Sequence, residues 1–338
     1  MTESNETGQS SDETTADVVV SDTPFVDVGI LADHLSDVGV TIDAVDTTDE
    51  ATLRRRASDA AALILDVNSP LPADVVADLD SLEVVARAGM GLDNVDVDAA
   101  RAAGVTVTNA PDYGVDEVAT HAVSLLLSCR RGVAAHDRDV RGGEWNWRTD
   151  RPQPRIRGST LGLVSFGDTA RRVVDLTRGF EFDVLVYDPY VDDGTVEAAG
   201  ATRVDFETLL ADSDMVSIHA PLTEDTRGMF DAAAFERLPD HAVVVNVGRG
   251  GIVDERALAE ALAAGEVAAA GLDVLAVEPP DEDNPLCGRD DVVVTPHTAW
   301  YSADARERLN RTVAEDVRRV LTGVEPEHPV ASGPVGAD

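Results

Sequence analysis

The stretch Leu161-Gly-Leu-Val-Ser-Phe-Gly-Asp-Thr-Ala170 decides the fold of this chain. Its apolar first half is typical of a buried strand, and its polar second half predicts a tight turn into a helix. Asp188 closes the next apolar run, 21 residues beyond Gly167. This is the layout of a dinucleotide-binding strand–helix–strand unit, in which the glycine lets a pyrophosphate approach the positive end of the helix.

Three residues of this unit shape the prediction further. Ser165 stands where the first glycine is usual, so a residue with a Cβ must fit a tight turn. Asp168 brings a negative charge to the expected pyrophosphate site. The stretch alone is therefore equally compatible with a purely structural turn. Asp188 is expected to accept hydrogen bonds from ribose hydroxyls and to repel a 2′-phosphate, which favours NAD over NADP.

Short apolar runs alternate with segments of helical periodicity on both sides of this unit. The alternation predicts parallel sheets with helices on both faces, and hence an α/β fold with two Rossmann-like domains. The expected strands are Asp17–Val20, Val40–Val45, Ala61–Val67, Leu82–Arg87, Val105–Asn109, Leu161–Ser165, Val184–Asp188, Met215–His219, Ala242–Val247, Ala269–Val274 and Val292–Thr295. A long helix is expected at Val115–Arg131, a polar loop from Arg141 to Pro154, and a last helix at Ser302–Leu321.

The composition excludes several classes of partner. The chain carries 64 acidic and 27 basic residues, a formal charge of −37, and no Lys occurs in it. Such a surface repels nucleic acid and anionic membranes, so we expect neither as a partner. It resembles the acidic, lysine-poor surfaces of proteins from halophilic archaea, where molar salt shortens the Debye length to about 3 Å and screens self-repulsion. An acidic protein from a mesophile is the alternative.

The chain shows no signal for membranes, secretion or metal binding. No stretch approaches the roughly 20 apolar residues that span a bilayer, and the polar N-terminus lacks the pattern of a secretory signal. We therefore expect a cytoplasmic protein, with residues 1–23 as a disordered acidic tail. Cys129 and Cys287 have neither a metal-binding nor a disulfide pattern, and Cys129 is expected to be a small core residue.

Four further motifs occur in order along the chain. They are Arg87-Ala-Gly-Met-Gly-Leu-Asp-Asn-Val-Asp96, Asn246-Val-Gly-Arg-Gly-Gly-Ile-Val-Asp254, Leu272-Asp-Val-Leu-Ala-Val-Glu-Pro279 and Thr295-Pro-His297. Together with the dinucleotide unit they resemble the D-isomer-specific 2-hydroxyacid dehydrogenase family, over roughly residues 25 to 325. Arg155-Ile-Arg-Gly158, Tyr187-Asp-Pro-Tyr190 and Pro296-His-Thr-Ala-Trp-Tyr-Ser302 resemble its C-terminal-binding-protein-like branch.

The resemblance implies an NAD-dependent oxidoreductase that interconverts a small 2-oxo acid and a D-2-hydroxy acid. Reduction needs a cation for the carboxylate and carbonyl oxygens, and Arg249 suits this role because a guanidinium holds two oxygens at once. It also needs an acid for the forming alkoxide, and His297 suits that role. Glu278 is expected to hydrogen-bond the imidazole, orient it and favour its protonated form. The other histidines, His121 among them, are expected to be structural or exposed.

The same resemblance assigns residues to the cofactor and the substrate. Arg87 and the loop Gly89-Met90-Gly91 are expected to bind the substrate carboxylate, with a plain glycine-rich turn as the alternative. Trp300 is expected to pack on the substrate side chain or within the protein. Thr226 is expected near the cofactor phosphates or as a helix cap. The other expected cofactor-binding residues are Ser165, Gly167, Asp168, Thr169, Asp188, Val247 and Asp273, the last at the nicotinamide carboxamide.

The family fold implies two domains and an active site in the cleft between them. The substrate domain is expected at residues 24–109 plus 297–330, and the NAD-binding domain at residues 110–296. Trp145 and Trp147 are expected either in a homodimer contact or in packing within one chain. Phosphoglycerate dehydrogenase and an NAD(H)-sensing, corepressor-like binding protein are the alternative functions. We expect no regulatory domain beyond the last helix.

Overall fold

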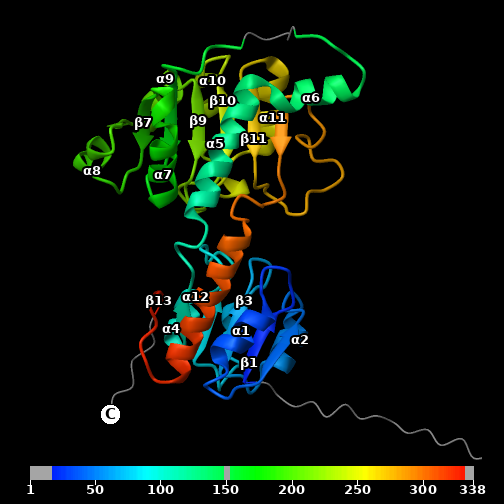
Figure 1. Ribbon diagram of the computed structural model, residues 1–338, viewed down its shortest axis with the longest axis vertical. Helices are drawn as coiled ribbons and strands as arrows, with labels where there is room; N and C mark the ends of the chain where they lie inside the picture. The colour runs from blue at the N-terminus through cyan, green and yellow to red at the C-terminus, as the bar shows by residue number, and fades with distance from the viewer. Residues whose placement is uncertain (1–16, 148–152, 332–338) are drawn as a thin grey trace, which may run out of the picture. The chain divides into compact units, whose positions relative to one another are not determined.

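The computed structural model describes residues 17–147 and 153–331. These residues form two compact units, each described here by itself (Figure 1). Unit 1 comprises the described residues up to Tyr113 and those from Arg306 onward, and unit 2 comprises the described residues of Gly114–Ala305. Each unit is built on one sheet covered by helices, as the alternation of strand and helix patterns predicts.

Unit 2 contains a seven-stranded sheet of order β12-β11-β10-β9-β6-β7-β8. The strands are β6 (Thr160–Val164), β7 (Asp183–Tyr187), β8 (Thr202–Arg203), β9 (Met215–Ile218), β10 (Val243–Asn246), β11 (Ala269–Leu272) and β12 (Val292–Val294). All neighbours pair in parallel, so the carboxyl ends of the strands share one edge. The strand order changes direction between β6 and β9, and α/β sheets bind ligands at such a switch point.

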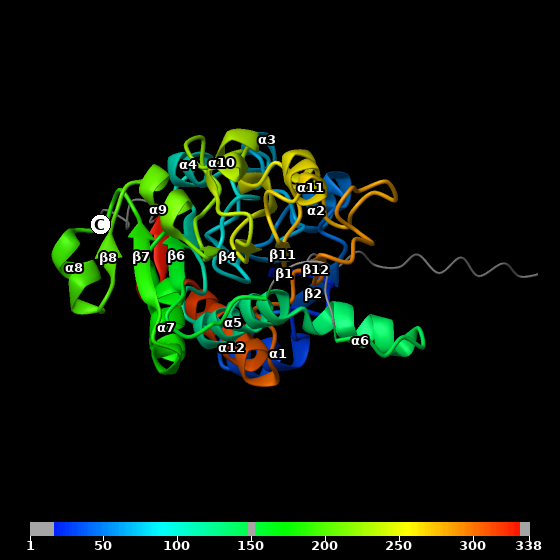
Figure 2. The same cartoon turned by 90° about the horizontal axis from the view of Figure 1, so that it is seen from above.

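Helices cover both faces of the sheet of unit 2. α5 (Val115–Arg131) and α7 (Asp168–Thr177) lie on one face, and α9 (Phe206–Asp212), α10 (Ala232–Arg237) and α11 (Glu255–Ala264) on the other (Figure 2). A cluster of buried apolar side chains fills the space on each side. Burial on both faces explains why these strands are continuous apolar runs. The remaining helical segments are α6 (Val133–Arg141), η1 (Arg178–Phe180), α8 (Asp193–Ala198) and η2 (Gly250–Ile252).

Unit 1 contains a six-stranded sheet of order β13-β5-β4-β3-β1-β2. Its strands are β1 (Val18–Ser21), β2 (Ile42–Val45), β3 (Ala62–Leu65), β4 (Val84–Arg87), β5 (Thr106–Thr108) and β13 (Pro329–Ala331). The first five are parallel, and β13 joins β5 antiparallel at the edge. One face carries α2 (Glu50–Arg56), α3 (Ala73–Val76) and α4 (Val97–Ala102); the other carries α1 (Val28–Leu35) and α12 (Ala303–Leu321) (Figure 2).

The structure corrects three expectations about local structure. The tail expected at residues 1–23 extends too far, because Val18–Ser21 is a buried strand paired with β2 and β3; residues 1–16 lie outside the described residues. Helix α6 was not expected, since it is polar on average and none of its residues is buried. The parallel sheet of unit 1 gains an antiparallel edge strand, β13, which was not expected because three residues are too few to show a pattern.

The boundaries of the units also differ from those expected. Residues 297–305 belong to unit 2, where the backbone of Ala299 donates to Asp273 at 2.9 Å and the Ser302 hydroxyl donates to Glu117 at 2.7 Å. Residues 110–113 belong to unit 1, where Ala110 N donates to the carbonyl of Gly89 at 3.0 Å. Hydrogen bonds between residues distant in sequence set these boundaries, and sequence periodicity does not report them.

The cysteines and the surface agree with the composition. Cys129 lies in the core of unit 2, where burial raises the pKa of its thiol to about 12. Cys287 is exposed, and both thiols are free.

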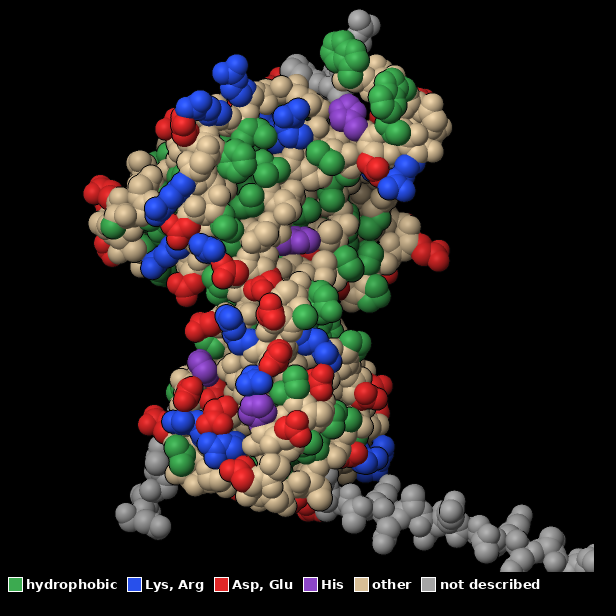
Figure 3. Space-filling model, viewed as in Figure 1, with side chains coloured by type: hydrophobic (Ala, Val, Ile, Leu, Met, Phe, Trp, Pro, Cys, Tyr) green, Lys and Arg blue, Asp and Glu red, His purple; other side chains and the backbone are tan. Residues whose placement is uncertain are grey.

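Acidic side chains are spread over the visible face of both units (Figure 3). Within the described ranges, no helix combines the length and apolar character that crossing a membrane requires.

Candidate active site

His297 and Glu278 meet beyond the carboxyl ends of β11 and β12. Nδ1 of His297 lies 2.7 Å from Oε2 of Glu278, so the hydrogen bond expected between them is present. The other carboxylate oxygen, Oε1, accepts a hydrogen bond from the backbone N–H of Leu275 at 2.8 Å. The backbone thus fixes the carboxylate and the carboxylate fixes the imidazole. This orients the ring through Nδ1 and makes Nε2 the atom that can exchange a proton with a ligand.

The surroundings of Glu278 keep it charged. Burial raises the pKa of this carboxyl, but the hydrogen bond and charge of His297, the Leu275 N–H and the charge of Arg249 together lower it by more. The resulting pKa lies below the usual value for Glu, so the side chain is a carboxylate at neutral pH. The carboxylate is therefore an acceptor for the Nδ1–H of His297.

A carboxylate anchors the loop that carries His297. The backbone of His297 is left-handed, with φ 50°, a conformation that is rare for residues other than glycine. Its N–H donates to the carbonyl of Asp273 at 2.8 Å. The carboxylate of Asp273 accepts hydrogen bonds from Thr298 N and Ala299 N, both at 2.9 Å, and from the Thr295 hydroxyl at 2.6 Å. Asp273 therefore holds the chain on both sides of His297.

His121 on α5 extends this anchor. Its Nε2 lies 2.9 Å from Oγ1 of Thr295 and 3.5 Å from Oδ1 of Asp273. The sequence pattern predicted a structural or exposed role for His121 and indicated no partner for it. Because 174 residues separate His121 from Thr295, no local spacing signals the contact; only the packing of α5 against the sheet creates it.

Arg249 follows β10 between two glycines that the backbone requires. A Cβ at Gly250 would lie 1.9 Å from the carbonyl carbon of Leu275, and one at Gly248 would lie 2.6 Å from a backbone oxygen. This close approach brings Arg249 beside the segment that leads to Glu278, and the charge of Arg249 acts on that carboxylate. The guanidinium donates from Nη1 to the carbonyl of Gly248 at 2.9 Å. Three of the predicted residues, Arg249, Glu278 and His297, thus lie together in unit 2.

The turn from β6 into α7 has the form that a dinucleotide site needs. Ser165 adopts φ 75°, the left-handed conformation that the usual first glycine would supply. A Cβ at Gly167 would meet no atom within 4 Å, so the space in front of the turn is open. Gly167 is the N-cap of α7, and Asp168 and Thr169 occupy its first turn without a side-chain cap on the helix N–H groups. These groups are therefore available to an anion.

The other helices that follow strands of unit 2 begin differently. In each of α8, α9, α10 and α11 a carboxylate at the N-cap accepts hydrogen bonds from the first-turn N–H groups. The capping residues are Asp192, Asp205, Asp231 and Asp254. Among these described helices, α7 alone presents an N-terminus without a side-chain cap, and it follows a strand at the switch point of the sheet.

Asp188 closes the same turn from the neighbouring strand. It is 7% exposed. Its Oδ2 accepts hydrogen bonds from Phe166 N at 2.8 Å and from the Ser165 hydroxyl at 3.5 Å, and its Oδ1 accepts one from Tyr190 N at 2.8 Å. A carboxylate has about four acceptor positions, so these bonds leave capacity for a ligand hydroxyl. The side chain therefore ties β7 to the β6–α7 turn and remains an acceptor.

Thr226, Val247 and Trp300 complete the predicted residues of unit 2. The Thr226 hydroxyl donates to the carbonyl of Pro221 at 2.7 Å and thus shapes the loop after β9. The helix-cap alternative for Thr226 is wrong, since the next helix begins six residues later with Asp231 as its cap. Val247 directly follows β10 and is partly buried. Trp300 is partly buried and packs edge-to-face on Tyr301, with ring centroids 5.6 Å apart.

The predicted substrate-binding residues Arg87, Gly89, Met90 and Gly91 lie at the carboxyl end of β4 in unit 1. Arg87 is 5% exposed and donates from Nη1 to the carbonyl of Ala88 at 3.2 Å. Gly89 has φ 147°, and a Cβ there would lie 1.6 Å from Nη1 of Arg87. Only glycine lets the guanidinium fold back beneath this loop. Met90, 43% exposed, stands on the surface of the loop.

Comparison with known proteins identifies the family. Residues 123–299 match the family model described as D-isomer specific 2-hydroxyacid dehydrogenase, NAD binding domain. The chain belongs to this family. The match falls within unit 2 and places its NAD-binding domain there, around the β6–α7 turn.

Individual relatives agree with the assignment to the D-isomer specific 2-hydroxyacid dehydrogenase family. D-3-phosphoglycerate dehydrogenase of Archaeoglobus fulgidus is 37% identical over 292 residues, 86% of this chain and 55% of that protein. Glycerate dehydrogenase of Methylorubrum extorquens is 36% identical over 261 residues, 75% of this chain and 81% of that protein. A crystal structure of a Thermus thermophilus protein aligns with a TM-score of 0.84 and 29% identity, covering 93% of this chain and 100% of that one. The chain spans about half the length of the D-3-phosphoglycerate dehydrogenases that it matches.

Proposed function

We propose that this chain is an NAD-dependent dehydrogenase that interconverts a small 2-oxo acid and the corresponding D-2-hydroxy acid. The observation that carries the proposal is the His297–Glu278 pair, 2.7 Å apart, with the charge of Arg249 acting on the same carboxylate. A cation and an oriented proton donor are the two groups that reduction of a 2-oxo acid demands. The family membership supports the same reaction class.

The residues of unit 2 fit NAD. The uncapped N-terminus of α7 and the open space at Gly167 suit a pyrophosphate, and Asp188 suits the ribose hydroxyls while repelling a 2′-phosphate. Thr226 and Val247 follow β9 and β10 at the same edge and would border the cofactor. The bound nicotinamide supplies or accepts the hydride. All other steps belong to the side chains of the protein.

Arg249 and His297 perform the two roles at the substrate. During reduction, Arg249 holds the substrate carboxylate and polarises the C2 carbonyl. His297 donates its Nε2 proton to the C2 oxygen as the hydride reaches C2, so the ketone becomes an alcohol by gaining one hydride and one proton. Glu278 remains a carboxylate and stabilises the imidazolium before transfer. In the oxidative direction His297 accepts the alcohol proton, and the same groups act in reverse.

We assign Asp273 a positioning role in place of the expected contact with the nicotinamide carboxamide. Its carboxylate accepts hydrogen bonds from Thr295, Thr298 and Ala299 and is almost fully buried. These bonds fix the left-handed backbone of His297, and His121 supports Thr295 from α5. Arg87 and its loop in unit 1 stay our prediction for a further contact with the substrate carboxylate.

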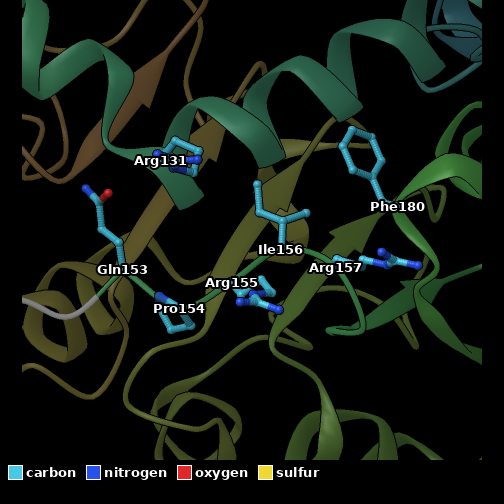
Figure 4. Close-up of a pocket in the computed structure, with 7 residues that line it drawn as sticks. All are labelled: Arg131, Gln153, Pro154, Arg155, Ile156, Arg157 and Phe180. Carbon is cyan, nitrogen blue, oxygen red and sulfur yellow. The ribbon is translucent and has the colours of Figure 1, made fainter.

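We further propose that the protein forms a homodimer through unit 2. Beyond α6, Trp145 is 90% and Trp147 82% exposed, and large hydrophobic side chains protrude at this end of unit 2 (Figure 3). Unit 2 also has a pocket that is lined by three arginines together with Ile156 and Phe180 (Figure 4). The arginines are Arg131, Arg155 and Arg157. Exposed aromatic side chains and arginines both suit a contact with a second copy of so acidic a chain.

The dimer proposal is tested by light scattering in 3 M KCl. A dimer is expected for the natural chain and a monomer for the double variant Trp145→Ser, Trp147→Ser. Tyr190→Ser, which removes an aromatic side chain that is 87% exposed on another part of unit 2, is the matched control and should remain dimeric. A monomeric natural chain would refute the proposal.

We also propose that the protein works in the cytoplasm, because its two cysteines are free thiols.

The proposed reaction is tested by following NADH absorbance in molar KCl. The panel contains glyoxylate, pyruvate and hydroxypyruvate, each run in parallel with NADPH. Turnover of at least one compound with NADH, lost in His297→Asn, is the expected result. Tight NADH binding without turnover of any compound would instead favour an NAD(H)-sensing binding protein.

A further inference from the structure

The carboxylate of Asp168 lies at the N-terminus of α7, where the proposed function places the pyrophosphate of NAD. Asp168 is the first residue of the helix after Gly167, is exposed, and caps none of the helix N–H groups. Within the described part of the chain this carboxylate has no hydrogen-bond or ion-pair partner. An uncompensated negative charge is therefore close to any anion that approaches those N–H groups.

The two arginines closest to Asp168 along the helix are engaged elsewhere. Arg171 and Arg172 follow it at the i+3 and i+4 positions, the spacings at which opposite charges pair on a helix surface. Instead, Nε of Arg171 donates to the carbonyl of Phe166 at 3.0 Å, and its guanidinium lies 5.5 Å from the centre of the Phe166 ring. Nε of Arg172 donates to the Asp116 carboxylate on α5. The tertiary structure thus withholds from Asp168 the partners that helical spacing would give it.

Asp188 adds a second carboxylate at the same turn. It is nearly buried, and its Oδ2 accepts a hydrogen bond from Phe166 N at 2.8 Å. Arg203 donates from Nε to the backbone carbonyl of Asp188 at 3.0 Å, but its Nη1 donates to the Asp193 carboxylate at 2.9 Å. Arg203 therefore pairs with Asp193, and two carboxylates border the β6–α7 turn.

The turn carries more negative than positive charge. The carboxylates of Asp168 and Asp188 are opposed by the guanidinium of Arg171 and by the end of α7, which is equivalent to about half an elementary charge. Arg227 lies against the segment after β10, since its Nη1 is 3.6 Å from the position that a Cβ of Gly251 would take. A pyrophosphate carries two negative charges. It therefore gains hydrogen bonds from the N–H groups of α7 but is repelled by Asp168.

We propose that Asp168 makes dinucleotide binding depend on salt, so that NADH binds weakly in dilute salt and tightly in concentrated salt. The Debye length falls from about 10 Å at 0.1 M to about 3 Å at 1 M salt. Repulsion between the carboxylate and the pyrophosphate is then screened, whereas hydrogen bonds from α7 act at contact distance and persist. The inference rests on the proposed function and concerns the regulation of its cofactor site by ionic strength.

The sign of the salt dependence distinguishes this site from an ordinary anion site. A site that attracts a dianion by positive charge loses affinity as salt rises, because screening weakens the attraction. Here the affinity should rise instead. The dissociation constant of NADH is measured by fluorescence titration at 0.5 M and 3 M KCl, with circular dichroism as the check on folding. We expect NADH to bind about 5-fold more tightly at 3 M.

Two variants test whether Asp168 is the cause. Asp168→Asn removes the charge at nearly constant size; it should bind NADH about 5-fold more tightly than the natural chain at 0.5 M KCl and change little between the two concentrations. Asp168→Arg reverses the charge and should bind more tightly at 0.5 M than at 3 M. Glu236→Gln makes an equal charge change at an exposed position of α10, on the other face of the sheet. This control should keep the salt dependence of the natural chain.

A second salt separates screening from a bound cation. Tetramethylammonium chloride at the same ionic strength screens charge as KCl does, but its bulky cation cannot be coordinated by a carboxylate. The gain in NADH affinity should therefore be the same in both salts. A gain that requires K⁺ overturns the inference, because a bound ion would then be its cause.

The outcomes separate the inference from the proposed function. An NADH affinity that rises with salt in the natural chain, is flat in Asp168→Asn and falls in Asp168→Arg supports the inference. An affinity that falls with salt in the natural chain, or rises equally in Asp168→Asn, overturns the inference and leaves the proposed function intact. Absence of NADH binding by the natural chain at both concentrations overturns the proposed function and the inference with it.

Discussion

Helix α7 of unit 2 and three helices of unit 1 begin in different ways, although all of them follow strands of parallel α/β sheets. In unit 2 the helix that follows the switch-point strand, α7, begins at Gly167 with uncapped N–H groups. In unit 1, α1, α2 and α4 begin with Asp27, Asp49 and Asp96, whose carboxylates accept hydrogen bonds from those groups. The same topology thus yields an N-terminus that is open to an anion in α7 and N-termini that a carboxylate occupies in α1, α2 and α4. One residue at the N-cap decides which.

The largest expected effect on kcat comes from replacing His297, the proposed proton donor of unit 2. His297→Asn removes the proton donor and should lower kcat by about 1000-fold, since general acid catalysis contributes 10²- to 10⁴-fold. NADH affinity, measured by fluorescence titration, should stay within 2-fold. His34→Asn in α1 of unit 1 is the control and should keep normal turnover. Near-normal turnover of His297→Asn would remove His297 from the mechanism.

Gly167→Asp tests directly whether the uncapped N-terminus of α7 matters for cofactor binding. This change gives α7 the cap that the helices of unit 1 have, and the carboxylate would both occupy the N–H groups and repel a pyrophosphate. NADH should bind about 100-fold more weakly, while the new cap stabilises the fold by about 1 kcal/mol. Gly167→Ala, whose Cβ has open space, is the uncharged control. Unchanged NADH affinity in Gly167→Asp would place the cofactor elsewhere.

Thr295→Val probes the anchor of the His297 loop. The variant loses the hydroxyl that joins His121 to Asp273, so the loop should spend less time in the reactive geometry. We expect kcat to fall about 10-fold with little change in KM, and the pH profile of kcat to shift. Thr298→Val makes the same chemical change in the same loop, where only the backbone N–H contacts Asp273, and should be close to normal. Equal behaviour of the two variants would contradict the positioning role.

The free energy of unfolding should depend on pH through His219, which follows β9 in unit 2. Burial lowers the pKa of this histidine to about 4, against about 6.5 in the unfolded chain. Between these values the unfolded state binds one more proton, so the free energy of unfolding falls as pH decreases from 6.5 to 4. The contribution is up to about 1.4 kcal/mol per pH unit in denaturant titrations. His219→Gln should flatten this slope, and an unchanged slope would show that His219 is not its source.

Ser165→Gly gives the smallest expected effect. Ser165 holds a left-handed backbone that costs about 1 kcal/mol for a residue with a Cβ, while glycine adds about 0.5–1 kcal/mol of unfolded-state entropy. The two terms nearly cancel, so the free energy of unfolding should change by less than about 0.5 kcal/mol. NADH affinity should stay within 3-fold. A larger gain in affinity would mean that Ser165 hinders the cofactor.

The amino-acid sequence predicted much of the fold and the principal candidates for the site. Continuous apolar runs such as Leu161–Val164 predicted buried parallel strands, because burial on both faces leaves no polar alternation. The motifs around Arg249, Glu278 and His297 identified the family, which the comparisons confirm. Two elements were not predicted from the sequence. Helix α6 has no buried residue and so lacks an apolar stripe facing a core, and strand β13 has only three residues.

Residue type and neighbouring residues set which segments prefer strands, which turns need glycine, and how negative the chain is. The tertiary structure alone decided which of these residues meet. It placed His121 against Thr295 across 174 residues and turned Asp273 into an anchor. Such contacts follow from the order in which strands pair, and strand order is set by long-range packing that local periodicity does not encode.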